Sequence, residues 1–309
     1  MDLSVIIPAH NELFLQQTVE NILENAEADT EVIAICDGYW PDPPILDHPK
    51  VTVIHHTESI GQRAATNEGA RISQADYIIK IDAHCAVGKG FDRILMEDCQ
   101  PDWTMIPSQY ALHAFDWQCK ECGNRTYQGT EPTTCQKCKT NDFDMVVVWE
   151  RRDKRLTISW RFDKEMHFQY WRKHRKRPEA QGDLVETMSC IGACFLIPRK
   201  RFWDIEGMDE GHGSWGQYGT EIACKSWLSG GKLVTSKRTW YAHMFRTGNF
   251  RGAFTHGSFP YPLSGNAQER ARKYSQDLWL NDKWSKAKYP VSWLVDRFKP
   301  VPDWHEGAR

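Results

Sequence analysis

The sequence lacks any apolar run of about 18 residues, the length that a membrane-spanning helix needs. It also lacks an excess of either charge, because 39 Lys and Arg stand against 41 Asp and Glu. This balance excludes a globally basic nucleic-acid binder but not a local basic patch. The first residues enter an apolar segment without the basic region and hydrophobic core of a secretory signal. We therefore expect a soluble, cytoplasmic protein with no membrane span.

Internal repeats are absent too, and the 309 residues, 40% of them hydrophobic, are enough for a packed core in one large or two modest domains. Ten cysteines are present. Without an export signal, they favour a reducing compartment and metal binding over a disulfide framework. Six are scattered among apolar or helical neighbours, whereas the other four form two tight pairs.

Short apolar segments alternate with helical patterns in the first 85 residues. The strand candidates are Ser4–Pro8, Val32–Cys36, Val51–Ile54 and Tyr77–Ile81, and the helix candidates are Leu13–Asn25 and Ile60–Ser73. This alternation predicts an α/β fold with a mostly parallel sheet covered by helices on both faces. Ligands bind beyond the carboxyl ends of strands in such sheets, and Asp37 and Asp82 lie at two of these ends.

The pattern changes three times along the chain, which predicts four segments. A polar, cysteine-rich stretch interrupts the α/β pattern, which then resumes with the strand candidates Met145–Trp149, Gly192–Pro198 and Lys232–Thr235 and a helix over Thr220–Leu228. A Pro-rich linker then leads to one amphipathic helix near 266–284. The predicted segments are 1–115 and 143–258 as two halves of one domain, 116–142 as an insertion, and 259–309 as a C-terminal helical extension.

The insertion holds two Cys-x-x-Cys pairs, Cys119 with Cys122 and Cys135 with Cys138, separated by 12 residues. Four thiolates at this spacing predict a closed tetrahedral zinc site, a zinc ribbon, in which no position is left for water. Gly123 supplies the tight turn that such a knuckle needs. Iron bound by the same four thiolates is the minor alternative.

Asp82 and His84 stand two residues apart at a strand end. On an extended segment both side chains can reach one divalent cation, because Ala83 between them points the other way. Alone, this triplet is a weak signal, since strand-end turns often hold the same residues.

Several ordered motifs, taken together, resemble the family 2-like glycosyltransferases, and among them the polypeptide N-acetylgalactosaminyltransferase branch. In the nucleotide-sugar half the motifs are Ser4–Glu12, Asp37–Gly38, Gly61–Gly69 and Ile81–Cys85. In the acceptor half they are Gly207–Gly211, Trp215–Gly216, Glu221 and His243–Arg246. The resemblance covers about residues 3–247 without the cysteine-rich insertion.

This resemblance implies a GT-A fold, a Rossmann-like nucleotide-diphospho-sugar transferase, with a UDP-sugar donor held by Mn²⁺ or Mg²⁺. Asp82, His84 and His243 would bind the metal. The implied donor-binding residues are Pro8, Glu12, Asp37, Arg63, Asp82, Trp215 and Arg246. The implied activity is that of a hexosyltransferase, in which the cation neutralises charge on the departing UDP.

The sequence departs from the family at the loop after Trp215–Gly216. Inverting members carry an acidic pair and retaining members Glu-Asn where this chain has Tyr218 and Gly219. Glu221 is the nearest remaining candidate for the catalytic base, with Asp209 and Glu210 behind it. A carboxylate that stabilises the start of a helix is the alternative reading of Glu221.

A basic run with interleaved aromatic residues follows the resumed strand pattern. Basic charge beside stacking surfaces is typical of nucleic-acid grooves, although a solvated charged face has the same composition. Some viral relatives of the family glycosylate hydroxymethylated DNA bases, so one hypothesis is a bacteriophage DNA-modifying enzyme in the host cytoplasm. The candidate DNA contacts are Arg172, Lys173, Arg175, Lys176 and Arg177.

Two alternatives stay open. One is a transferase that acts on a glycan, polysaccharide or protein. The other is a zinc-ribbon nucleic-acid-binding protein on a degenerate transferase scaffold, which the missing acidic pair favours and the retained Asp82, His84 and His243 disfavour. The sugar, the acceptor, the stereochemical outcome and the oligomeric state are not encoded in any readable motif.

Overall fold

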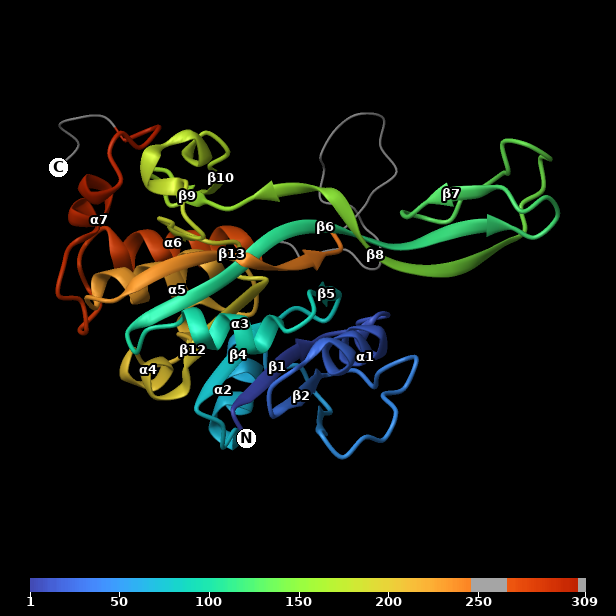
Figure 1. Ribbon diagram of the computed structural model, residues 1–309, viewed down its shortest axis with the longest axis horizontal. Helices are drawn as coiled ribbons and strands as arrows, with labels where there is room; N and C mark the ends of the chain where they lie inside the picture. Colours follow the sequence, from blue (N-terminus) through green and yellow to red (C-terminus); the bar gives the residue numbers. More distant parts are fainter. Residues whose placement is uncertain (246–265, 305–309) are drawn as a thin grey trace.

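Parallel strands form the first half of the sheet in this computed structural model, which describes residues 1–245 and 266–304 (Figure 1). In this half they are β1 (Leu3–Ala9), β2 (Thr30–Asp37), β3 (Val51–His56) and β4 (Tyr77–Ile81). The connecting helices are α1 (Leu15–Asn25) and α2 (Gln62–Ile72). The sequence-predicted parallel sheet is confirmed here.

The second half of the sheet mixes both directions. It contains β5 (Cys85–Val87), β6 (Trp103–Cys119), β7 (Arg125–Tyr127), β8 (Phe143–Thr157), β11 (Leu184–Glu186), β12 (Cys194–Pro198) and β13 (Lys232–His243). A separate hairpin joins β9 (Trp160–Phe162) to β10 (Phe168–Tyr170). The helices of this half are α3 (Phe91–Asp98), α4 (Arg199–Asp204) and α5 (Tyr218–Leu228), with 3₁₀ turns η1 (His174–Lys176), η2 (Pro178–Ala180) and η3 (Glu210–His212).

The order of the eight strands on the main path of the sheet is β11-β13-β6-β12-β4-β1-β2-β3. The direction in which strands are added reverses at β1. From β1 the chain moves through β2 to the edge strand β3, then crosses back to place β4 on the other side of β1. Right-handed crossovers in opposite directions put α1 and α2 on opposite faces of the sheet. The carboxyl ends of β1 and β4 therefore flank a topological switch point, the usual ligand site of such sheets.

Helix α2 packs closely on β1, every residue of which is buried. Gly69 of α2 permits this approach, because a Cβ atom there would lie 2.5 Å from Cγ2 of Ile6. Close helix-to-strand packing fixes the height of the first turn of α2 above the sheet. That turn is the part of the helix that reaches the switch point.

The cysteine-rich insertion forms the tip of a long arm that extends from the rest of the chain (Figure 1). The arm is the antiparallel pair β6 and β8, and β7 adds a short strand near its end. Because β6 continues to Cys119 and β8 resumes at Phe143, the predicted insertion at 116–142 corresponds to the tip of the arm. The length of β6 and β8 places this tip away from the switch point.

The C-terminal extension contains two helices, α6 (Ala267–Trp279) and α7 (Val291–Arg297), rather than the single helix expected from the sequence. α6 packs against η3 and α7 against α5. Through these contacts the extension supports the loop that carries Asp209 and Glu210. Among the residues that the structure describes, no helix has the length and apolarity to cross a membrane.

Candidate metal and donor site

Three potential metal ligands meet at the switch point although they are far apart in the sequence. Asp82 directly follows β4, His84 lies in the turn before β5, and His243 ends β13. β5 pairs with β13 so that His243 is opposite Cys85, which brings the two histidines together. Sheet pairing thus places a residue of the second half beside the Asp-x-His triplet.

The ligand atoms of this cluster have separations that suit one cation. Nε2 of His84 lies 3.1 Å from Nε2 of His243, which lies 3.3 Å from Oδ2 of Asp82. Two ligands at about 2.1 Å from a cation and at right angles to each other are about 3 Å apart. One carboxylate and two imidazoles therefore fit three adjacent positions of an octahedral ion, and Mn²⁺ accepts both ligand types.

The charge state of the cluster also suits a metal. Burial lowers the pKa of His243, which favours the neutral imidazole that a metal requires. Burial acts to raise the pKa of Asp82, but the charge of Lys80 and the hydrogen bond with His243 outweigh it and hold that pKa well below its ordinary value. The carboxylate is thus ionised at neutral pH.

Glu12 lies behind His84. Its Oε2 is 2.9 Å from Nδ1 of His84, so the ring donates through Nδ1 and presents the lone pair of Nε2 to the cluster. The resemblance implied a contact between Glu12 and the donor; the structure places the carboxylate where it orients a metal ligand.

Asp37 joins the end of β2 to the start of α2. Its carboxylate accepts hydrogen bonds from Oγ of Ser59 at 2.8 Å and from the backbone N–H groups of Ile60 at 2.5 Å and Gly61 at 3.0 Å. The side chain is buried. The implied uridine contact of Asp37 would therefore have to replace or share these bonds.

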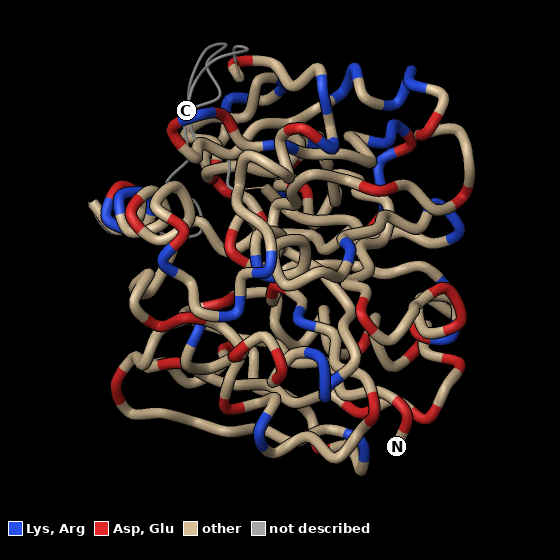
Figure 2. The backbone as a smooth tube through the Cα atoms, turned by 90° about the vertical axis from the view of Figure 1, so that its left-hand side faces the viewer, with Lys and Arg blue, Asp and Glu red and all other residues tan. Residues whose placement is uncertain are grey.

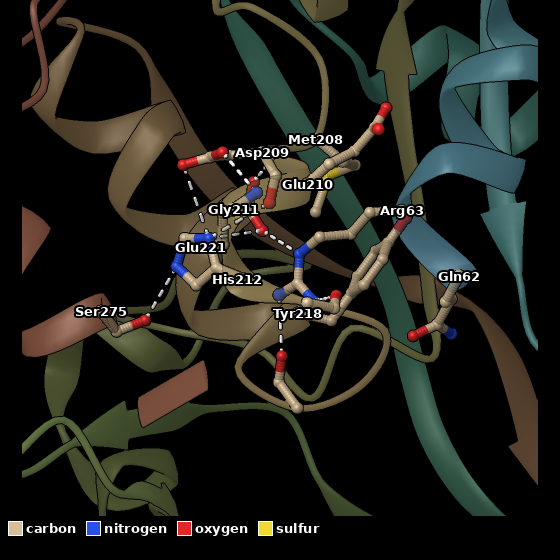
Figure 3. Close-up of polar contacts among 12 residues, drawn as sticks. Gln62, Arg63, Met208, Asp209, Glu210, Gly211, His212, Tyr218, Glu221 and Ser275 are labelled. Atoms are coloured by element: carbon tan, nitrogen blue, oxygen red, sulfur yellow. Dashed lines mark hydrogen bonds and ion pairs between the residues drawn. The ribbon is translucent and has the colours of Figure 1, made fainter. Parts of the chain in front are cut away.

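Arg63 and Glu221 form a buried ion pair between α2 and α5 (Figure 3). Nε of Arg63 donates to Oε2 of Glu221 at 2.7 Å, and the other guanidinium nitrogens donate to the carbonyls of Gly213 at 3.0 Å and Gly216 at 2.7 Å. Arg63 is 1% exposed and Glu221 is 0% exposed. The geometry thus gives Arg63 a role in holding the 213–216 loop, rather than the donor contact that the resemblance implied.

Glu221 has no free oxygen for proton transfer. Oε1 accepts the backbone N–H of Asp209 at 2.5 Å and lies 3.2 Å from Nζ of Lys225, while Oε2 is bound to Arg63. These contacts argue against the sequence-based choice of Glu221 as catalytic base, because a base must reach the acceptor hydroxyl. We assign Glu221 a positioning role.

The two other candidate bases lie on the loop that Glu221 holds. Asp209 accepts from Gly211 N–H at 2.9 Å and from the Tyr274 hydroxyl of α6 at 3.0 Å. Glu210 is exposed, accepts from Nδ2 of Asn67 at 3.0 Å, and lines a cavity of about 260 Å³ between α2 and this loop. Of the three carboxylates, Glu210 is thus the one that faces open space.

Tyr218 and Gly219, where the sequence departs from the family motif, are fixed by close packing. Gly219 lies where a Cβ atom would collide with the carbonyl of Cys190, so no larger residue fits. Tyr218 is buried, and its hydroxyl donates to Oγ1 of Thr66 at 2.7 Å. A buried aromatic ring and a glycine therefore occupy the two positions at which the resemblance implied polar side chains.

The four cysteines of the arm converge as the sequence predicted. Sγ of Cys119 lies 3.4 Å from Sγ of Cys138, and Sγ of Cys122 lies 3.6 Å from the sulfurs of Cys119 and Cys135. Sulfurs about 2.3 Å from a tetrahedral ion are about 3.8 Å apart, so the cluster matches zinc closely. This four-cysteine cluster and the Asp82 cluster are the two potential metal centres among residues 1–245 and 266–304.

The basic run divides into exposed and structural residues. Arg177 donates to the carbonyl of Phe298 at 2.8 Å and to that of Pro300 at 2.5 Å, and so anchors the C-terminal segment. The side chains left in solvent are those of Arg172, Lys173, Arg175 and Lys176. Figure 2 shows Lys and Arg as well as Asp and Glu along much of the backbone in that view.

The other donor-binding residues that the resemblance implied are Pro8, Trp215 and Arg246. Pro8 is buried in β1, paired with Ile35 of β2, and Trp215 is half-buried in the loop that Arg63 holds. Arg246 lies outside the described residues. Sequence reasoning missed Lys80 and Gln62, which contact the Asp82 carboxylate; a lysine inside an apolar strand was the available signal.

The chain is similar to known glycosyltransferases in sequence and in fold. Residues 4–111 match the family model described as Glycosyl transferase family 2. The chain is 26% identical over 296 residues to polypeptide N-acetylgalactosaminyltransferase 8 of Drosophila melanogaster, which covers 90% of this chain and 44% of that protein. It is 24% identical over 297 residues to human polypeptide N-acetylgalactosaminyltransferase 10, covering 90% of this chain and 42% of that protein. The chain thus spans less than half the length of these relatives.

A solved structure of GalNAc-T7 with UDP, GalNAc and Mn²⁺ superposes with a TM-score of 0.64 at 18% identity, covering 92% of this chain and 49% of that one. At this identity the likeness concerns the fold. It confirms the α/β GT-A fold, to which this chain adds the four-cysteine arm.

Proposed function

We propose that this protein is a metal-dependent glycosyltransferase that moves a sugar from a UDP-sugar to an acceptor hydroxyl. The observation that carries the proposal is the convergence of Asp82, His84 and His243 at the switch point. The family match of residues 4–111 and the likeness to the GalNAc-transferase fold support a nucleotide-sugar donor.

The residues of the site would have different roles in such a transfer. Mn²⁺ or Mg²⁺, held by Asp82, His84 and His243, supplies positive charge to a diphosphate leaving group. Glu12 orients His84 toward that position. Glu210, exposed at the edge of the cavity beside α2, is the carboxylate that we propose takes the acceptor proton.

Release of UDP from a panel of UDP-sugars, measured with and without Mn²⁺, tests this function. We expect one donor to be hydrolysed slowly by the protein alone and faster with an acceptor. Chelation should abolish the release. Absence of turnover and of UDP binding across the panel would contradict the assignment.

We propose further that the acceptor is anionic, because Arg172, Lys173, Arg175 and Lys176 expose four positive charges on one short segment. DNA containing 5-hydroxymethylated pyrimidines is the acceptor to test first, beside a neutral glycan and a peptide. Modification of the DNA and loss of that activity in a variant with all four residues changed to Ser support this choice. Modification of the glycan or peptide alone excludes it.

The second candidate function is nucleic-acid binding without catalysis, which the buried Tyr218 and Gly219 favour because they stand in place of the family's acidic pair. Binding of DNA that is unchanged in Asp82→Asn, together with no donor turnover, would support it. Donor turnover excludes it.

We propose that the four-cysteine cluster holds structural zinc. Cys119→Ser is expected to reduce bound zinc from about one per chain to nearly none, because tight binding needs all four thiolates. The arm tip should lose its protection from proteolysis while the sheet remains folded. Metal analysis and limited proteolysis measure both effects, and Cys99→Ser, a buried cysteine outside the cluster, is the matched control.

A further inference from the structure

Lys80 is a charged residue at the centre of an apolar strand. It lies in β4 between Ile6 of β1 and Phe195 of β12, and it is 0% exposed. Burial of an ammonium group is costly unless the group is paired and hydrogen-bonded. Lys80 is paired, since its Nζ forms an ion pair with Asp82 and donates to the carbonyl of Gly192 at 2.9 Å.

The ion pair determines which oxygen of Asp82 faces the metal cluster. Oδ1 accepts from Lys80 and also from Nε2 of Gln62, at 3.2 Å. Oδ2 is the oxygen that lies toward His243. Because Lys80 and Asp82 are two residues apart on an extended segment, both side chains lie on the same side.

Tyr218 closes the other side of Lys80. The ammonium lies 4.7 Å from the centre of the Tyr218 ring, over its face, which is a favourable cation–π distance. The tyrosine is itself held by its bond to Thr66. Lys80 is therefore confined beside the metal cluster.

The charges around the cluster set how strongly a bare cation is held. Asp82 and Glu12 contribute two negative charges and Lys80 one positive charge, and imidazoles that coordinate a cation are neutral and contribute none. A divalent cation would leave the site with one net positive charge. That state favours an anionic ligand at the same place, whereas without Lys80 the filled site would be neutral.

We propose that Lys80 is a positioning residue that couples metal binding to diphosphate binding, so that the cation is held tightly only together with the donor. This inference rests on the proposed UDP-sugar donor. By linkage, a diphosphate that tightens cation binding is itself bound more tightly by the same factor when the cation is present. Coupling factors of about 10 to 100 are typical of such pairs of sites.

Electron paramagnetic resonance of free Mn²⁺ tests the proposal on the full chain, with and without UDP. For the unmodified protein we expect UDP to tighten Mn²⁺ binding by at least about tenfold. Lys80→Met should bind Mn²⁺ alone at least about tenfold more tightly and lose most of the UDP effect. Lys80→Arg, which keeps the charge, should retain the coupling.

Lys225→Met is the matched control, because Lys225 is also a buried lysine, ion-paired with Glu221, but does not contact the metal cluster. Its Mn²⁺ affinity should equal that of the unmodified protein. Mn²⁺ binding that is unchanged or weaker in Lys80→Met overturns the proposal. If Lys80→Met does not fold, the unmodified protein still decides, since Mn²⁺ binding that neither UDP nor inorganic pyrophosphate tightens also overturns it.

Binding experiments with pyrophosphate distinguish failure of this inference from failure of the proposed function. Coupling with pyrophosphate that Lys80→Met loses, with no coupling to UDP, supports the role of Lys80 and contradicts the nucleotide donor. Coupling with UDP that persists undiminished in Lys80→Met supports the donor and removes the role of Lys80.

Discussion

Asp82→Asn is expected to lower metal-dependent UDP release by at least about a hundredfold, because it removes the anionic ligand of the cluster and with it the charge that holds the cation. Asparagine keeps an oxygen for Lys80 and Gln62, so the local hydrogen bonds survive. Steady-state rates as a function of Mn²⁺ concentration measure the effect.

His243→Ala removes the ligand that comes from the other half of the sheet. It should weaken Mn²⁺ binding and thereby lower metal-dependent UDP release by a similar factor. Asp47→Ala, an exposed carboxylate on the loop before β3, is the control that should retain full activity. Thermal melts of all variants show whether the fold is intact. Unchanged metal dependence in both Asp82→Asn and His243→Ala would remove the metal assignment.

The sequence predicted those residues of the site that lie close to one another along the chain. Asp82 and His84 are two residues apart in the sequence, and the apolar run before them identifies the buried strand β4, which ends at Ile81. Local spacing likewise identified the four cysteines, which the structure brings together. His243 is 161 residues from Asp82, and the resemblance alone connected them.

Long-range ion pairs could not be predicted, since a carboxylate near a helix start has the same sequence pattern whether it faces solvent or a buried arginine. Arg63 and Glu221 are 158 residues apart, and each was assigned a substrate role that its burial now argues against. Helix starts were also misplaced. Thr220 was expected to begin α5, but the helix starts at Tyr218, because Gln217 adopts a left-handed conformation with φ of 58°.

The importance of Lys80 is not apparent from the local sequence pattern. One lysine among three isoleucines leaves the strand prediction for 77–81 intact, so the lysine stands out as a charge in an apolar strand but the pattern does not say what it contacts. Its significance depends on what its ammonium group meets, namely Asp82, Gly192 and Tyr218. Those contacts come from three separate parts of the chain.

Glu221→Gln is expected to destabilise the protein by about 3 to 5 kcal/mol, the usual cost of breaking a buried ion pair from one side. Arg63 and Lys225 would keep their charges in a buried site without the carboxylate that neutralises them. Urea denaturation at pH 7 measures the loss. In the fraction that remains folded, turnover should fall much less than in Glu210→Gln, because Glu221 positions the loop at 209–216 but does not touch the acceptor.

Acid should reduce this difference in stability. Burial acts to raise the pKa of Glu221, but the charges of Arg63 and Lys225 outweigh it and lower the pKa to about 2 from an ordinary 4.5. A lowered pKa means that the ion pair contributes its full stability above pH 4.5 and loses it as the pH falls toward 2. The stabilities of the unmodified protein and of Glu221→Gln should therefore converge over that range.

Glu210→Gln provides the contrast that decides between the two roles. It should leave stability within about 0.5 kcal/mol, since the side chain is exposed, and lower turnover by about a hundredfold or more if Glu210 takes the acceptor proton. The reverse pattern, a stable Glu221→Gln with turnover lost and an active Glu210→Gln, would return the base to Glu221. It would also require the loop at 209–216 to open far enough to bring that carboxylate out of its contact with Arg63.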